Sequence, residues 1–199
     1  MKDKPLNTCS QESCRSCSIR YELTCHLTLL KLLRFWFFVL PSLLIGGIII
    51  YNHSINSFIS WGLIIGLFFL LFGIRVLCTH CPHYNKPSRI LRCWANYGVP
   101  KFWKYRPQPM NFTEKAILIS GFSLVFGYPI LFIPLIQSWI VLFIYLLSVA
   151  FFFVFMSRYN CSKCINFSCP FNRVNDKVRE EFLKYNTSIN VTPKPGFDF

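Results

Sequence analysis

Long uncharged stretches alternate along the chain with segments that carry charged residues. Residues 35–51, 55–74 and 116–157 contain no Lys, Arg, Asp or Glu. A helix of about 20 apolar residues is long enough to cross the hydrocarbon core of a bilayer. Residues 116–157 are too many for one span, and Pro and Gln at 134–138 favour a turn there. The pattern predicts an all-α membrane protein with four transmembrane helices, arranged as two hairpins.

Pro129 lies inside the third predicted span. Proline lacks an N–H and leaves the carbonyl four residues earlier without its helical partner. Lipid offers no replacement, so that carbonyl must find a partner within the protein. We expect Pro129 to kink the span rather than to end it.

The basic residues are strongly one-sided with respect to these spans. The chain has 21 Lys and Arg against 8 Asp and Glu, with six, eight and seven of the basic residues in segments 1–34, 75–115 and 158–199. Loops rich in Lys and Arg stay in the cytoplasm. This bias predicts a multi-pass plasma membrane protein with both termini cytoplasmic. The predicted units are an N-terminal Cys-rich segment, a hairpin, a basic loop, a second hairpin and a Cys-rich tail: 1–34, 35–74, 75–115, 116–157 and 158–199.

All ten cysteines fall in the segments predicted to be cytoplasmic, where structural disulfides rarely persist. Metal ligation or thiol chemistry is therefore favoured. Two C-x2-C motifs follow the second and fourth spans directly, and such a turn lets two thiolates bind one metal ion. Both spans run toward the cytoplasm, so we expect one shared site in a Cys-rich cap. Its predicted ligands are Cys78, Cys81, Cys161 and Cys164, with Cys93, Cys169, His80 and His83 as further candidates.

A second group of cysteines precedes the first span and is predicted to form another metal site. Its members are Cys9, Cys14, Cys17 and Cys25. The C-x4-C-x2-C spacing of the first three is similar to the opening of plant-type [2Fe–2S] ferredoxin ligation. The glycine-rich loop of those ferredoxins is missing here.

Zinc and iron–sulfur clusters both accept four thiolates, so the spacing leaves the metal open. Structural zinc would hold a small cap folded and leave a scaffold that recruits a cytoplasmic protein partner. An iron–sulfur centre would make the chain an electron-transfer protein, and Cys-Pro pairs at Cys81 and Cys169 are common in bacterial ferredoxins. Thiol–disulfide exchange or metal trafficking is the third alternative.

The loop between the second and third spans mixes cations with aromatic residues. Lys101 and Lys104, for example, alternate with Phe102, Trp103 and Tyr105. The pattern favours a loop lying on anionic lipids of the inner leaflet. A site for an anionic ligand is the alternative, and nucleic acid is disfavoured this close to the membrane. In the tail, the spacing of Val174, Val178 and Phe182 predicts a short amphipathic helix within 172–185.

The same loop carries a resemblance to a known family. The segments Cys78-Thr-His-Cys81-Pro-His, Leu91-Arg-Cys93, Ala95-Asn-Tyr-Gly98-Val-Pro-Lys101 and Tyr105-Arg-Pro107 resemble those of small Cys-rich four-span membrane proteins of anaerobic archaea and bacteria. The resemblance implies a four-span layout in a prokaryotic plasma membrane and implies no activity.

Several other functions are disfavoured by the sequence. The four spans contain no Lys, Arg, Asp or Glu, which disfavours ion-coupled transport. His26 and His53 flank opposite ends of the first span, which disfavours transmembrane haem. Motifs of hydrolases and phosphate-binding loops are absent. No catalytic residue is assigned, and a non-enzymatic role is favoured.

Overall fold

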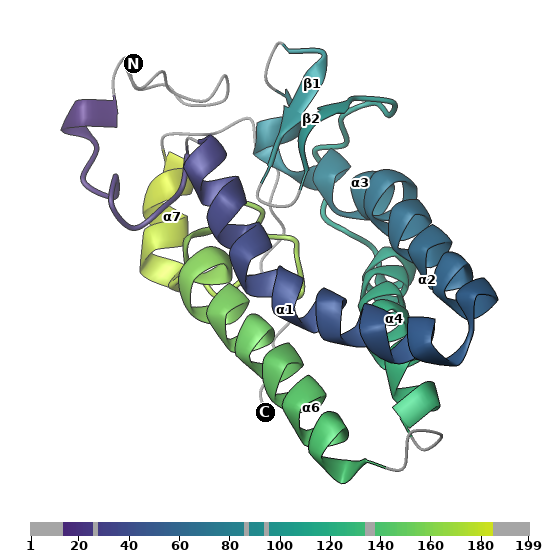
Figure 1. The fold of residues 1–199 in the computed structure, drawn as a ribbon. Coiled ribbons are helices and arrows are strands. Elements are labelled where there is room, and N and C mark those ends of the chain that lie inside the picture. The colour runs from purple at the N-terminus through teal and green to yellow at the C-terminus, as the bar shows by residue number, and fades with distance from the viewer. Residues whose placement is uncertain (1–13, 26–27, 86–87, 94–95, 134–137, 185–199) are drawn as a thin grey trace.

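The computed structural model describes residues 14–25, 28–85, 88–93, 96–133 and 138–184. Four of its helices are long and apolar enough to cross a membrane, which confirms the four predicted spans. They cover Leu29–His53, Ile55–His80, Phe112–Phe132 and Trp139–Lys163. Figure 1 shows α1 (Leu29–His53) lying between α2 (Ile55–Leu67) and α6 (Trp139–Phe155).

The second and fourth spans each change from an α-helix to other helix types toward the end that carries a C-x2-C motif. α2 passes into a π-helical turn and then a short α-helix, and α6 passes into a second π-helical turn. A 3₁₀ turn follows in both cases. These segments are η2 (Phe68–Phe72), α3 (Gly73–Val76) and η3 (Cys78–His80) in the second span, and η6 (Met156–Asn160) and η7 (Cys161–Lys163) in the fourth.

Polar side chains mark where spans begin. Ser54 separates α1 from α2, and its hydroxyl accepts a hydrogen bond from the Ser57 N–H at 3.4 Å. α4 (Phe112–Gly127) begins with a capping box, in which Asn111 and Glu114 each accept a hydrogen bond from the other's backbone N–H. Such caps satisfy N–H groups that a helix start leaves without partners.

Pro129 does not end the third span, which continues to Phe132. The α-helix gives way to the 3₁₀ helix η5 (Tyr128–Phe132), with Pro129 in its first turn. The indole N–H of Trp61 donates to the Val125 carbonyl at 2.9 Å, which is the carbonyl that a proline at 129 leaves without a helical partner. The hydroxyl of Tyr145 donates to the carbonyl of Phe126, the residue after Val125, at 2.7 Å. These bonds join the third span to its two neighbours.

Two small elements lie at the end of the bundle where α3 and η7 end. β1 (Ile90–Arg92) and β2 (Tyr97–Pro100) form an antiparallel ribbon, which the all-α expectation did not include. Gly98 at φ +85° provides the left-handed residue that this ribbon needs. The predicted amphipathic helix is α7 (Asp176–Lys184). Figure 1 shows both elements at the end of the bundle where α1 begins.

The buried face of α7 packs onto a separate apolar cluster outside the long helices. Val178 and Phe182 of α7 lie against Val174, which precedes the helix, and against residues from two other segments. The remaining buried members are Ile19, Leu23, Ile165 and Phe167. α7 therefore ties the N-terminal segment to the residues that follow η7.

Candidate metal centre

The two C-x2-C motifs have the same local conformation. We call residues 78–81 the first knuckle and residues 161–164 the second knuckle. Each lies on a 3₁₀ turn after a π-helical segment, and each ends in an extended cysteine with φ −84°, with ψ 134° at Cys81 and 127° at Cys164. In each knuckle the N–H of the last cysteine points to the carbonyl of the first, at 3.0 and 3.5 Å. π-Helical turns inside helices are frequent at functional sites.

Six cysteines from the two halves of the chain line one cavity, which we call the cysteine cavity. Its volume is about 300 Å³. Three of the cysteines precede α4 and three follow α6: Cys78, Cys81 and Cys93, then Cys161, Cys164 and Cys169. Phe35, Phe68, Phe122 and Phe152 of the long helices close its other end. The structure therefore brings together the two predicted knuckles and both additional candidate cysteines.

Thiols of the two halves interact across the cysteine cavity. Cys164 of the second knuckle interacts electrostatically with Cys81 of the first, and Cys169 interacts with Cys93. Within the first half, the thiols of Cys78 and Cys93 form a hydrogen bond. None of the nine described cysteines is joined in a disulfide. The six thiols thus form one connected group.

Backbone and amide groups point at the sulfurs. The backbone N–H of Asn166 donates to the Cys164 sulfur, and that of Phe171 donates to the Cys169 sulfur. The Asn172 N–H donates to the Cys169 carbonyl at 3.0 Å. The side-chain amide of Asn96 lies 3.9 Å from the Cys78 sulfur. Hydrogen bonds to the charged form of a group favour that form. These donors therefore support thiolates, which are the metal-binding form of cysteine.

Without a metal, burial keeps these thiols protonated. Burial raises the pKa of Cys164 well above its usual range, and the nearby Cys81 and Cys169 raise it further. Burial also raises the pKa of Cys169 to about 12, against the lowering effect of the Phe171 N–H. A bound cation reverses this preference, because a thiol that coordinates a metal is deprotonated outright.

Three contacts hold the two knuckles next to each other. The side-chain amide of Asn166, two residues after the second knuckle, donates to the Leu77 carbonyl at 3.0 Å, directly before the first. The Thr24 N–H donates to the Lys163 carbonyl at 2.8 Å, and the Thr24 carbonyl lies 3.2 Å from His83 Nε2. Thr24 therefore links the second knuckle to the residue that closely follows the first.

The two candidate histidines lie differently. His80 Nδ1 is 2.5 Å from the Gln108 carbonyl, and Nε2 is 3.2 Å from Glu114, which also pairs with Arg106 at 2.5 Å. His80 is not among the residues that line the cysteine cavity, and it joins the first knuckle to the start of α4. His83 lines the cavity, but its Nε2 faces Thr24.

The N-terminal cysteines lie apart from this group. Cys9 is outside the described residues, and Cys14 and Cys17 frame the turn η1 (Cys14–Ser16). Cys17 and Cys25 pack against the apolar cluster under α7. None of these three described cysteines lines the cysteine cavity. The second metal site, which needs all four cysteines, stays a prediction.

The six thiols surround the cavity rather than crowding at one point. Among the described residues, no three His, Cys, Asp or Glu side chains are grouped closely enough to hold one metal ion. Ligands of one zinc ion must each lie about 2.3 Å from it, which brings the sulfurs within about 4 Å of one another. A centre of several metal ions spreads its thiolates farther apart. A single zinc ion would therefore require the thiols to move closer together.

The chain is therefore a protein with four helices able to span a membrane and a cavity of six cysteines at one end of them. Comparison with family models, with curated proteins and with solved structures found no match. Its function has to be argued from the cavity and its surroundings.

The supporting residues of the cavity were not among those predicted. Asn96, Asn166 and Asn172 are buried, and each hydrogen-bonds to a cysteine or to backbone next to one. A sequence signal did exist for the shared conformation. Arg75 and Arg158 each stand three residues before a knuckle, so that Arg-x-x-Cys-x-x-Cys occurs twice. This repeat coincides with the local backbone conformation that the two knuckles share.

Proposed function

We propose that this chain is an integral membrane protein that binds a metal centre through the thiolates of the cysteine cavity. The observation that carries the proposal is the convergence of six cysteines, three from each half, on one cavity of about 300 Å³. Amide donors aimed at these sulfurs add to it. A purely structural set of thiols would have no need of such donors.

The proposed topology places the cavity at the cytoplasmic face of a plasma membrane. Basic residues concentrate in the three segments outside the spans, and both knuckles follow spans that end at this face. Each pair of spans then forms a hairpin, and the β ribbon, α7 and the knuckles form the cytoplasmic cap. The exposed rings of Phe102 and Trp103, next to Lys104, provide contact with anionic lipids.

We favour an iron–sulfur cluster over a single zinc ion. The support is the number of cysteines that line one cavity, together with the Cys81-Pro82 and Cys169-Pro170 pairs. Such a centre at the membrane surface suits an electron-transfer protein. The alternative is a zinc-held scaffold whose cap recruits a cytoplasmic protein.

One experiment separates the two candidates. The protein is purified anaerobically, its metals and acid-labile sulfide are measured, and its visible and electron paramagnetic resonance spectra are recorded before and after dithionite. An iron–sulfur centre gives a brown sample whose absorption bleaches on reduction. Colourless protein that contains zinc would support the scaffold. Protein with neither metal above background would contradict both.

A further inference from the structure

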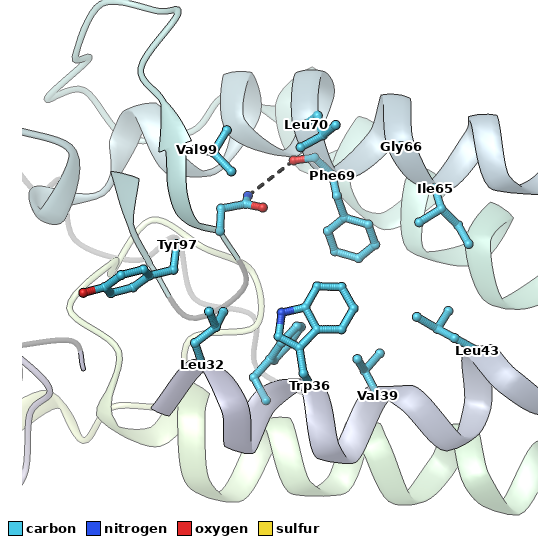
Figure 2. Close-up of a pocket in the computed structure, with 12 residues that line it drawn as sticks. Leu32, Trp36, Val39, Leu43, Ile65, Gly66, Phe69, Leu70, Tyr97 and Val99 are labelled. Carbon is cyan, nitrogen blue, oxygen red and sulfur yellow. Dashed lines mark hydrogen bonds between the residues drawn. The ribbon is translucent and has the colours of Figure 1, made fainter. Parts of the chain in front are cut away.

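A second hollow lies beside the cysteine cavity, on the flank between α1 and α2. We call it the lateral groove; its volume is about 290 Å³. Figure 2 shows the side chains of Trp36 and Phe69 pointing toward each other from α1 and from the second span, with Gly66 on the α2 side. Its other apolar lining residues are Leu32, Phe35, Val39, Leu43, Ile65, Leu70 and Val99. The groove therefore faces the region that lipid would occupy.

The lateral groove and the cysteine cavity share one wall. Phe35, Phe69 and Asn96 line both. The side-chain amide of Asn96 is 7% exposed, donates to the Phe69 carbonyl at 3.3 Å, and lies 3.9 Å from the Cys78 sulfur. Figure 2 marks the bond to Phe69 with a dashed line. A molecule in the groove would thus be separated from the thiols by a single layer of side chains.

The lining selects the chemistry of the occupant. The aromatic side chains of Trp36 and Phe69 suit contact with a flat ring, and the apolar sides along α1 and α2 suit a hydrocarbon tail. Asn96 adds a polar group at one end. Its amide nitrogen is already engaged with Phe69 and Cys78, and its side-chain oxygen can accept a hydrogen bond from a hydroxyl of the reduced quinol. A plain acyl chain would use neither the aromatic rings nor the Asn96 side-chain oxygen.

We propose that the lateral groove binds an isoprenoid quinone, which exchanges electrons with the metal centre in the cysteine cavity. This inference rests on the proposed metal centre and names its reaction partner. Each electron that passes to the quinone oxidises the reduced centre by one electron. Two such transfers, with two protons from cytoplasmic water, convert the quinone to the quinol. A soluble one-electron donor then reduces the centre again after each transfer, and dithionite takes that role in the assay.

Two glycines of α2 provide a matched test. Gly66 lines the groove and Gly62 does not, and a Cβ added at either would meet no atom within 4 Å. Gly66→Leu therefore fills the groove without a clash in the fold, and Gly62→Leu is its control. The dithionite-reduced protein, freed of excess reductant, is mixed with a short-chain quinone, and reoxidation is followed by stopped-flow absorbance. Ferricyanide serves as the soluble oxidant that needs no groove.

We expect Gly66→Leu to slow reoxidation by quinone about tenfold or more. Its metal content and its reoxidation by ferricyanide should stay as in wild type. Gly62→Leu should behave as wild type in every assay. Equal quinone rates in all three proteins, or a reduced centre that quinone does not oxidise, would overturn the proposal.

Binding is measured separately, so that failure of the metal centre and failure of the groove are told apart. Quenching of tryptophan fluorescence by the same quinone is titrated, with Trp36→Phe to assign the signal. Quenching that Gly66→Leu weakens about tenfold supports quinone binding even in protein without iron. If iron is absent, the metal proposal and the electron transfer both fail, whatever the titration shows. If iron is present but quenching is unaffected by Gly66→Leu, or phospholipid displaces the quinone equally well, the groove is an ordinary lipid contact.

Discussion

The first and second knuckles share a backbone conformation and differ in what surrounds them. Cys78 and Cys81 of the first are buried, whereas Cys161 and Cys164 of the second are half-buried. The middle loop holds the first knuckle, through bonds such as that from the Arg106 N–H to the Thr79 carbonyl at 2.9 Å. The tail holds the second, where the Arg173 N–H donates to the Cys161 carbonyl at 3.1 Å.

The comparison separates the backbone conformation that the two knuckles share from the different segments that support each knuckle. The π-helical turn, the 3₁₀ turn and the extended last cysteine recur in both halves. The supports come from unrelated segments, one with a β ribbon and one with an amphipathic helix. What recurs is the placement of two thiols at the cavity, which is the feature that a shared metal centre requires.

The largest expected effect comes from removing one thiol of either knuckle. Cys81→Ser and Cys164→Ser should each abolish the metal centre, despite their different burial, because both sulfurs serve one site. The double variant should be no worse than either single one, since residues that act on one site are not additive. Elemental analysis of anaerobically purified protein measures this. Half the metal in each single variant and none in the double would mean two separate centres.

The second-largest effect is expected from loss of the hydrogen bond between Asn166 and Leu77, which joins the two halves of the chain. Asn166→Ala leaves the carbonyl of the half-buried Leu77 without the amide donor that now lies 3.0 Å away. An unsatisfied buried polar group costs about 1–3 kcal/mol. We expect a lower midpoint of thermal unfolding and faster loss of metal to a chelator. Asn52→Ala, at an exposed position at the far end of α1, is the control and should change neither value.

A third prediction uses the difference in burial directly. In protein stripped of metal, an alkylating reagent should reach the half-buried Cys161 before Cys78 and Cys81, which are only 4% and 6% exposed. Mass spectrometry of the labelled peptides gives the order. Glu114→Gln removes the charge that pairs with Arg106 beside His80, so it should speed labelling of the first knuckle alone. If Glu114→Gln sped alkylation equally at both knuckles, this would contradict the view that separate segments support the two knuckles.

The smallest effect is expected at the N-terminal cysteines. Cys17 packs against the apolar cluster under α7 and does not line the cysteine cavity. Cys17→Ser should leave the spectrum of the cavity centre unchanged, and should change the free energy of unfolding by about 1 kcal/mol at most. If Cys9, Cys14, Cys17 and Cys25 bind a metal of their own, its loss in this variant will appear as a separate step in metal content.

The sequence predicted the spans well because their signals are local. Runs of uncharged residues mark all four helices, and the missing N–H of Pro129 predicted a freed carbonyl that found a partner in Trp61. The meeting of the two knuckles followed from the direction of their spans. Asn96 and Thr24 could not be predicted, because their roles depend on contacts between segments far apart in the chain. The β ribbon was missed because strands of three and four residues leave little pattern.

X-ray absorption at the metal edge of the anaerobically purified protein tests the central claim most directly, because it reports the atoms around the metal. The account predicts a shell of sulfur alone at about 2.3 Å, with a second shell from neighbouring metal atoms, and loss of this signal in both Cys81→Ser and Cys164→Ser. A first shell of nitrogen or oxygen, or a sulfur shell that survives in both variants, would contradict a thiolate centre shared by the two knuckles.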